Sequence, residues 1–155
     1  MRKESQELLH ELTEATGISG YETEIRAIIR RRLEDRCEIQ RDNLGSIICV
    51  RRGAADRPRV MLPAHMDEIG FMVKSITEDG FIRFSTVGGW WAHVILSQRV
   101  RVKSRKGTWE GVVGARTYHL LPPEEREKMQ KVADMFIDVG AGSRKEATEK
   151  LGIRI

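Results

Sequence analysis

The sequence predicts an α/β protein in two parts, on the basis of three observations. Apolar residues recur at helical spacing near the amino terminus, and an unbroken apolar run of strand length follows at Val60–Leu62. Beyond residue 70, short strand-like runs alternate with glycine turns. We therefore expect an α/β portion at residues 1–69 and a small barrel-like, β-rich portion at residues 70–155.

Two amphipathic helices are expected first. The first covers about Lys3–Ala15, with one buried stripe, and the segment Thr16–Gly20 interrupts it. Ser19 stands three residues before Glu22, which has the form of a capping box, so a second helix should begin there. The expected inner faces are Leu8, Leu9, Leu12 and Ala15 in the first helix, and Ile25, Ile28, Ile29 and Leu33 in the second.

A hairpin and a buried strand should complete the first part. The runs Cys37–Arg41 and Ser46–Arg52 flank Asp42–Gly45, whose residue types tolerate a tight or left-handed turn. The run Val60–Leu62 does not alternate with polar residues, which is typical of a strand buried on both faces. Such a strand would carry the residues that follow it to the edge of a sheet.

The second part should be a series of short strands with little helix. Strands are expected at 71–76, 81–84, 99–103, 108–113 and 135–139. Pro122 and Pro123 should start a short helix at 124–131, and Ser143 with Glu146 should cap a helix that Gly152 ends. Residues 153–155 have the pattern of a further strand.

Composition excludes several classes of function. The chain has 27 basic and 23 acidic residues, but they are mixed along the sequence, without the aromatic and basic platform of a nucleic-acid binder. No segment approaches the roughly 20 apolar residues of a membrane span, and the charged amino terminus is unlike a signal peptide. Cys37 and Cys49 are too few for a disulfide framework or a zinc finger, which favours a reducing cytoplasm.

The candidate chemistry lies at His65 and Asp67, directly after the apolar run. In extended chain, residues two apart project to the same side, so both side chains can face one pocket. A metal-bound imidazole usually donates its second ring N–H to a carboxylate, and a His-x-Asp sequence can supply both groups. The pattern alone is also compatible with a hydrogen-bonded structural pair.

Eight ordered blocks of the sequence resemble the amino-terminal part of a known family. These are residues 16–22, 41–45, 64–73, 88–90, 98–100, 111–114, 119–121 and 136–140. Together they are similar to the glutamyl and deblocking aminopeptidases, dinuclear-metal enzymes that assemble as tetrahedral particles. The resemblance implies a peptidase-type α/β catalytic domain, present here in part, which is interrupted by a small PDZ-like β domain that mediates dimerisation.

The resemblance also implies an activity and roles for residues. Such enzymes remove amino-terminal residues from peptides with two divalent ions, usually zinc or cobalt. His65 matches the first metal ligand and Asp67 the neighbouring catalytic carboxylate. The other ligands and the general base lie, in the family, beyond the matched segment. We therefore expect this chain to be inactive alone and to bind no metal tightly, because a dinuclear site needs several carboxylate and imidazole ligands.

Other candidate residues are assigned to contacts. His119 matches one of the blocks and could face substrate or a neighbouring subunit. Trp90 and Trp91 are also candidates for a substrate or subunit contact, and for them packing or subunit contacts are favoured over a substrate platform. His10 and His93 are poor candidates for completing ligands. The sequence departs from the family's usual pattern at 91–93 and 116–118, which leaves the details of a subunit contact open.

Two functions from different classes remain. The chain is either the front part of a metalloaminopeptidase, as a fragment, a truncated gene product or half of a split enzyme completed by a downstream polypeptide, or a non-catalytic module that self-assembles. A homo-oligomer is expected in both cases. A glycosidase is disfavoured, because it needs two carboxylates facing each other across a sugar site and the adjacent Asp67 and Glu68 should point to opposite faces.

Overall fold

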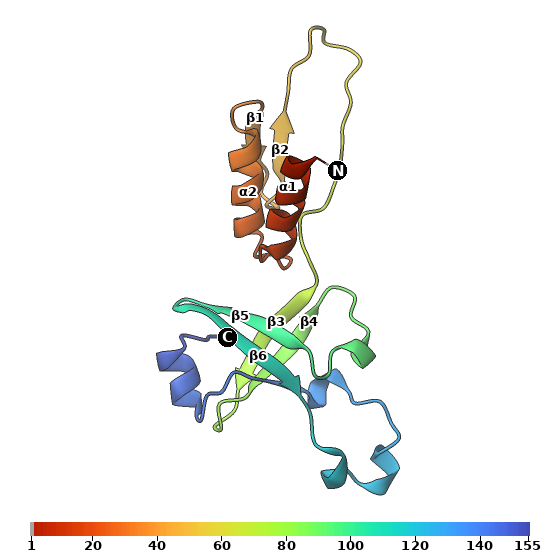
Figure 1. Ribbon diagram of the computed structural model, residues 1–155, viewed down its shortest axis with the longest axis vertical. Coiled ribbons are helices and arrows are strands. Elements are labelled where there is room, and N and C mark those ends of the chain that lie inside the picture. Colours follow the sequence, from red (N-terminus) through yellow and green to blue (C-terminus); the bar gives the residue numbers. More distant parts are fainter. Residues whose placement is uncertain (1) are drawn as a thin grey trace. The chain divides into compact units, whose positions relative to one another are not determined.

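The computed structural model describes residues 2–155 (Figure 1). The chain divides into two compact units, Met1–Glu68 and Ile69–Ile155. Within the described residues, the first unit holds the α-helices and the second is built on an antiparallel sheet, so the chain is an α/β protein. No helix in residues 2–155 is both long and apolar enough to cross a bilayer.

The first unit consists of two helices and a hairpin. Helix α1 covers Lys3–Glu14 and α2 covers Thr23–Leu33, and their small core contains Ala15, Ile25 and Ile28. The stripe expected on α1 is only half-buried, and Leu9 is exposed because this core is too small to cover it. The Glu11 carboxylate joins the two helices by ion pairs with Arg31 and Arg32.

The hairpin is confirmed at the expected turn. Strand β1, Glu38–Arg41, pairs antiparallel with β2, Ile47–Val50, from Glu38 opposite Val50 to Arg41 opposite Ile47. The Asp42 carboxylate accepts hydrogen bonds from the Leu44 and Ser46 amides at 3.0 and 2.8 Å, and Gly45 has φ +97°. This local turn chemistry fixes the register of the hairpin.

The strand expected at Val60–Leu62 is absent, and that prediction is wrong. The three side chains are 79%, 83% and 90% exposed, and the segment has no regular structure. Among the described residues of the first unit, β1 and β2 pair only with each other. The apolar run therefore lacks the neighbouring strands that would bury it.

The second unit contains a five-stranded antiparallel sheet in the order β3-β4-β7-β6-β5. Its strands are Gly70–Ile76 (β3), Ile82–Val87 (β4), Arg99–Ser104 (β5), Gly107–Gly114 (β6) and Phe136–Asp138 (β7), which confirms the expected series of short strands. The sheet is curled, and its core includes Ile82, Ile95, Val113, Met135 and Ile153.

Helical structure in this unit is short. Turns of 3-10 helix occupy Ala92–Val94, Tyr118–Leu120, Pro123–Glu125 and Val132–Asp134. The helix expected at 124–131 is therefore wrong. All but the last residue of 122–130 are exposed, so no apolar face holds a longer helix against the sheet.

The final helical segment begins and ends where expected. The Glu146 amide donates to the Ser143 hydroxyl at 3.1 Å, residues 144–150 are helical, with a π-helical stretch at Glu146–Lys150, and Gly152 follows with φ +71°. The strand expected at 153–155 is not formed. Instead the Ile153 amide donates to the Ala147 carbonyl at 3.0 Å, and the Ile153 side chain is buried in the core.

Candidate functional site

His65 and Asp67 lie in an irregular segment of the first unit, not at a strand end. The His65 Nδ1 atom is 3.1 Å from Asp67 Oδ1 and 3.0 Å from the Asp67 carbonyl oxygen. Both oxygens are acceptors, so in the neutral ring Nδ1 carries the proton and Nε2 carries the free lone pair. The pairing is therefore the one that prepares Nε2 to bind a metal ion.

A second contact holds the carboxylate of this pair. The Ser19 hydroxyl donates a hydrogen bond to Asp67 Oδ2, the oxygen that does not face His65. This hydrogen bond is the main cause that keeps the pKa of the Asp67 carboxyl below its ordinary value, and the His65 imidazole acts in the same direction. Asp67 is thus ionised and oriented by two neighbours at neutral pH.

The segment that carries Ser19 is fixed to the residues after His65. The Gly17 amide donates to Glu68 Oε1 at 3.0 Å, the Glu68 amide donates to the Gly17 carbonyl at 2.8 Å, and Ile18 forms a parallel bridge with Glu68. A Cβ atom on Gly17 would lie 2.6 Å from Ile25 Cγ1, so glycine permits this close approach to α2. We call residues 17–19 together with 67–68 the Ser19 clamp.

The Ser19 clamp corrects one interpretation of the sequence. Ser19 does not cap the second helix, which begins at Thr23 after Glu22, because its hydroxyl bonds Asp67 instead. The Gly20 amide bonds the Glu22 carboxylate, a contact within the turn itself. A serine in a glycine-rich break signals a turn or a cap equally well, and the contact with Asp67 spans 48 residues. Local sequence therefore gave no sign of it.

The donor set is incomplete for a metal centre. His65 is 86% exposed, and residues 2–155 contain no cluster of three or more His, Cys, Asp or Glu side chains able to hold an ion. The His65 Nε2 atom therefore supplies one ligand to a metal ion, and one ligand does not make a complete coordination sphere. The other ligands of a dinuclear site would have to come from outside this part of the chain.

The aromatic candidates lie in the second unit and differ from one another. Trp90 donates from Nε1 to the Gly70 carbonyl at 2.9 Å and stacks on Phe71 with 4.5 Å between ring centroids, which makes it a packing residue. Trp91 is 66% exposed and meets His93 edge-on. His119 is exposed in the Tyr118–Leu120 turn, next to the ring of Tyr118.

The sequence and the fold both match known proteins. The family model described as M42 glutamyl aminopeptidase matches residues 45–155, and a second model, AMPT, matches residues 3–28. The putative aminopeptidase FrvX of Escherichia coli is 44% identical over 152 residues, which are 96% of this chain and 42% of that protein.

Two solved structures are similar along nearly all of this chain. A TET aminopeptidase from Thaumarchaeota archaeon SCGC AB-539-E09 has a TM-score of 0.94 and 43% identity, covering 99% of this chain and 43% of its own. The Pyrococcus horikoshii TET1 peptidase, described as assembling into a tetrahedron or a large octahedral shell, has a TM-score of 0.80 and 37% identity, covering 93% of this chain and 43% of its own.

These matches run through both units, although the chain spans only about two fifths of the length of the relatives. The matched family model covers the segment with His65, Asp67 and the whole sheet of the second unit. The chain therefore belongs to the M42 glutamyl aminopeptidase family.

Proposed function

We propose that this chain supplies one part of a metal-dependent aminopeptidase, which removes amino-terminal residues from peptides. The observation that supports it most is the His65 ring, whose Nδ1 atom faces two Asp67 oxygens and whose Nε2 atom is left to bind a metal. Membership of the M42 family supports the same reaction class. When bound, two divalent ions, zinc or cobalt, would supply Lewis acidity for the hydrolysis of the peptide bond.

The residues of this chain would act before and around that step. His65 would hold one ion through Nε2, and Asp67 would keep the imidazole in the required tautomer and orientation. Ser19 would hold the second oxygen of Asp67, so that the carboxylate cannot rotate away from His65. The bridging carboxylate, the general base and the other ligands would come from the part of the family's length that this chain does not span.

A reconstitution experiment tests the proposal. The chain alone should not hydrolyse amino-acid anilides with added zinc or cobalt, because a lone histidine organises too little of a dinuclear site. Mixing with a polypeptide that carries the rest of a relative, such as the unmatched portion of E. coli FrvX, should create tight zinc binding that calorimetry can follow.

The His65→Ala variant should abolish that binding, whereas His93→Ala should preserve it, because His93 is an exposed histidine of the second unit. If the chain alone hydrolysed the anilides and the His65→Ala variant did not, the proposal that a second polypeptide must complete the metal site would be refuted. A mixture that binds zinc no more tightly than the separate polypeptides would refute the assignment of His65.

For the second unit we propose a PDZ-like domain that makes subunit contacts in a homo-oligomer. Support comes from large side chains left in solvent, among them Trp91 and Leu120, and from the assembly described for the P. horikoshii relative. His119 stands beside Leu120 and would face substrate or a neighbouring subunit, while Trp90 would support Trp91 from within the fold. The two free cysteines support a cytoplasmic location.

The alternative, a non-catalytic self-assembly module, is favoured by one observation. The described residues offer a single metal ligand, His65, which is too few for a catalytic centre. The second unit, in contrast, already has exposed apolar side chains of the kind that subunit contacts use. The same mixing experiment separates the two functions, because a module would self-associate but gain no zinc site.

A further inference from the structure

Glu68 follows Asp67 directly, but its side chain is bonded to a segment 51 residues earlier in the chain. In extended chain, neighbouring side chains point to opposite faces. Glu68 Oε1 accepts a hydrogen bond from the Gly17 amide at 3.0 Å, and the Glu68 amide donates to the Gly17 carbonyl at 2.8 Å. One residue beside the candidate site thus bonds both main-chain groups of Gly17.

The hydrogen bond from Gly17 to the Glu68 carboxylate is costly to lose. Gly17 is buried, although Glu68 is exposed over most of its surface. A buried main-chain N–H that has no acceptor costs more free energy than its hydrogen bond contributes. On its other side Gly17 is packed against α2, where a Cβ atom would lie 2.6 Å from Ile25 Cγ1. Packing and the Glu68 carboxylate together therefore set the position of Gly17.

Ser19 is held in a turn whose two ends are both fixed. Ile18 forms a parallel bridge with Glu68, and the Ile18 carbonyl accepts a hydrogen bond from the Tyr21 amide at 2.8 Å. Ser19 lies between these contacts, and its hydroxyl donates to Asp67 Oδ2. The place of that hydroxyl therefore depends on the anchoring of the turn by Glu68.

Asp67 is anchored through the residues on both sides of it. Met66 packs against the small core of the two helices, and Glu68 bonds the segment before α2. The Asp67 carboxylate meets Ser19 at one oxygen and His65 at the other. Of the two flanking residues, Glu68 is the one whose hydrogen bonds reach the segment that carries Ser19. It therefore sets the two segments against each other.

We propose that Glu68 is a positioning residue of the candidate site, which acts through Gly17 and Ser19 to hold the Asp67 carboxylate against His65. His65 is thereby kept with its proton on Nδ1 and with Nε2 open to a metal ion. The inference rests on the proposed function for the use of Nε2, although every hydrogen bond that carries it lies within the first unit. In this role Glu68 needs an acceptor oxygen at the right reach rather than a negative charge.

NMR of the imidazole nitrogens in the chain alone, with EDTA present, tests the inference without metal. In weakly alkaline solution the ring is neutral, and the two nitrogen resonances report which atom carries the proton. In the unchanged chain the protonated atom should be Nδ1 of His65. In Glu68→Ala the ratio of the Nδ1–H form to the Nε2–H form should fall about threefold, because releasing Ser19 loosens the Asp67 acceptor.

Two conservative variants separate the hydrogen bond from the charge. Glu68→Gln keeps an oxygen at the same reach, which can accept from Gly17, so the tautomer ratio should stay near that of the unchanged chain. Glu68→Asp keeps the charge but shortens the side chain, so it should behave as Glu68→Ala does. The reverse order, or equal ratios in these two variants, would overturn the inference. The comparison decides the matter even where Glu68→Ala unfolds the helices, which their amide resonances would reveal.

A double variant tests the route through Ser19. Ser19→Ala alone should lower the tautomer ratio by about the same factor as Glu68→Ala, and the two changes together should lower it no further. Factors that multiply in the double variant would overturn this route, as would a ratio that Ser19→Ala leaves unchanged.

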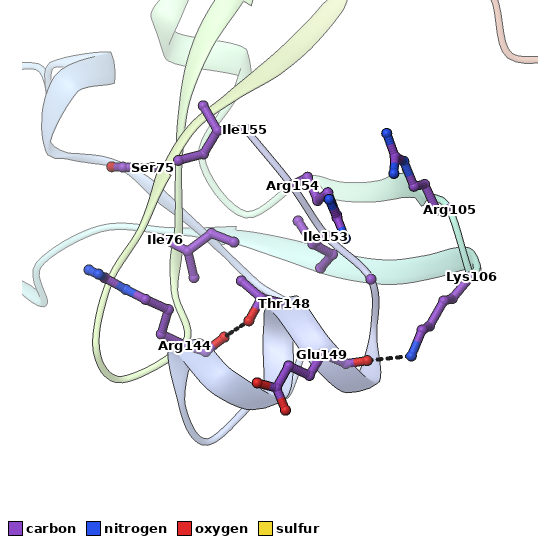
Figure 2. Close-up of a pocket in the computed structure, with 11 residues that line it drawn as sticks. Ser75, Ile76, Arg105, Lys106, Arg144, Thr148, Glu149, Ile153, Arg154 and Ile155 are labelled. Carbon is purple, nitrogen blue, oxygen red and sulfur yellow. Dashed lines mark hydrogen bonds between the residues drawn. The ribbon is translucent and has the colours of Figure 1, made fainter.

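Glu149→Ala is the matched control. Figure 2 shows this exposed glutamate in the second unit, where its main-chain carbonyl accepts a hydrogen bond from Lys106 while its carboxylate points away from that lysine. The control removes the same charged group outside the Ser19 clamp, so the tautomer ratio of His65 should not change. An effect as large as that of Glu68→Ala would overturn the assignment.

Zinc binding by the mixture with the unmatched portion of E. coli FrvX separates this inference from the proposed function. Glu68→Ala should weaken zinc binding about threefold, whereas Glu68→Gln should preserve it. A mixture that binds no zinc, while the tautomer ratio responds as expected, would contradict the proposed function and leave the role of Glu68 supported. Zinc binding that depends on His65, together with a tautomer ratio that no Glu68 variant changes, would overturn this inference alone.

Discussion

Replacing Gly80 by alanine should destabilise the second unit far more than the same change at Gly140. Both glycines have left-handed backbones, with φ +88° and +74°. A Cβ atom on Gly80 would lie 2.4 Å from the Ala141 carbonyl oxygen, whereas one on Gly140 would meet no atom within 4 Å. The pair therefore separates backbone strain from steric conflict at two glycines of similar positive φ.

The expected magnitudes follow from these two contributions. An L-residue in the left-handed region costs about 1–2 kcal/mol, and alanine recovers about 0.4–1 kcal/mol by restricting the unfolded chain. Gly140→Ala should therefore lower the free energy of unfolding by about 1 kcal/mol. At Gly80 the conflict is with main-chain atoms that cannot rotate away, which adds about 1–3 kcal/mol of overpacking strain.

Urea unfolding followed by tryptophan fluorescence is the suitable assay. All three tryptophans, Trp90, Trp91 and Trp109, lie in the second unit, so the signal reports that unit while the helical unit stays silent. The slope of the transition should not change, because neither variant alters the surface exposed on unfolding. Two variants that agree within about 0.5 kcal/mol would refute the steric argument, and a stabilising Gly140→Ala would refute the strain argument.

Three further perturbations have defined outcomes. The pKa of Glu11 is lowered chiefly by its hydrogen bond with Arg32. The pair therefore stabilises the helical unit at pH values above the ordinary carboxyl pKa, and this stabilisation is lost as the pH falls through the lowered pKa. Arg32→Gln should raise the pKa of Glu11 in an NMR titration. Ser19→Ala should raise the pKa of Asp67 towards its ordinary value in the same kind of titration, because the serine hydrogen bond is the largest cause of its depression. Trp91→Glu should weaken self-association in sedimentation velocity, and a clean monomer of 17.7 kDa for the unchanged chain at micromolar concentration would refute the proposed subunit contact.

Features encoded within a few residues could be predicted from the sequence. The hairpin formed as expected because Asp42 accepts two amides of its own turn and Gly45 takes the left-handed conformation. The last helical segment likewise begins at the hydroxyl of Ser143 and ends at Gly152. In both cases the signal and the structure that it specifies lie in the same short stretch.

Features that depend on distant partners could not be predicted in the same way. The run Val60–Leu62 has the composition of a buried strand, but a strand is buried only by neighbours, and the described part of the first unit offers none. Ser19 has the spacing of a helix cap, yet its hydroxyl bonds a carboxylate far along the chain. Pattern alone cannot decide between a local and a distant acceptor for one hydroxyl.

The Ser19 clamp explains why this candidate site is already arranged although residues 2–155 offer only one ligand position for a metal. Gly17 bonds Glu68 in both directions, and Ser19 bonds Asp67, so two adjacent residues after His65 are tied to one short segment before α2. All of these contacts lie inside the first unit, so the His65–Asp67 geometry does not depend on where the second unit sits. A completing polypeptide would meet a carboxylate and an imidazole that are already paired. It would therefore not have to order them at the moment of metal binding, which lowers the entropic cost of assembling the centre.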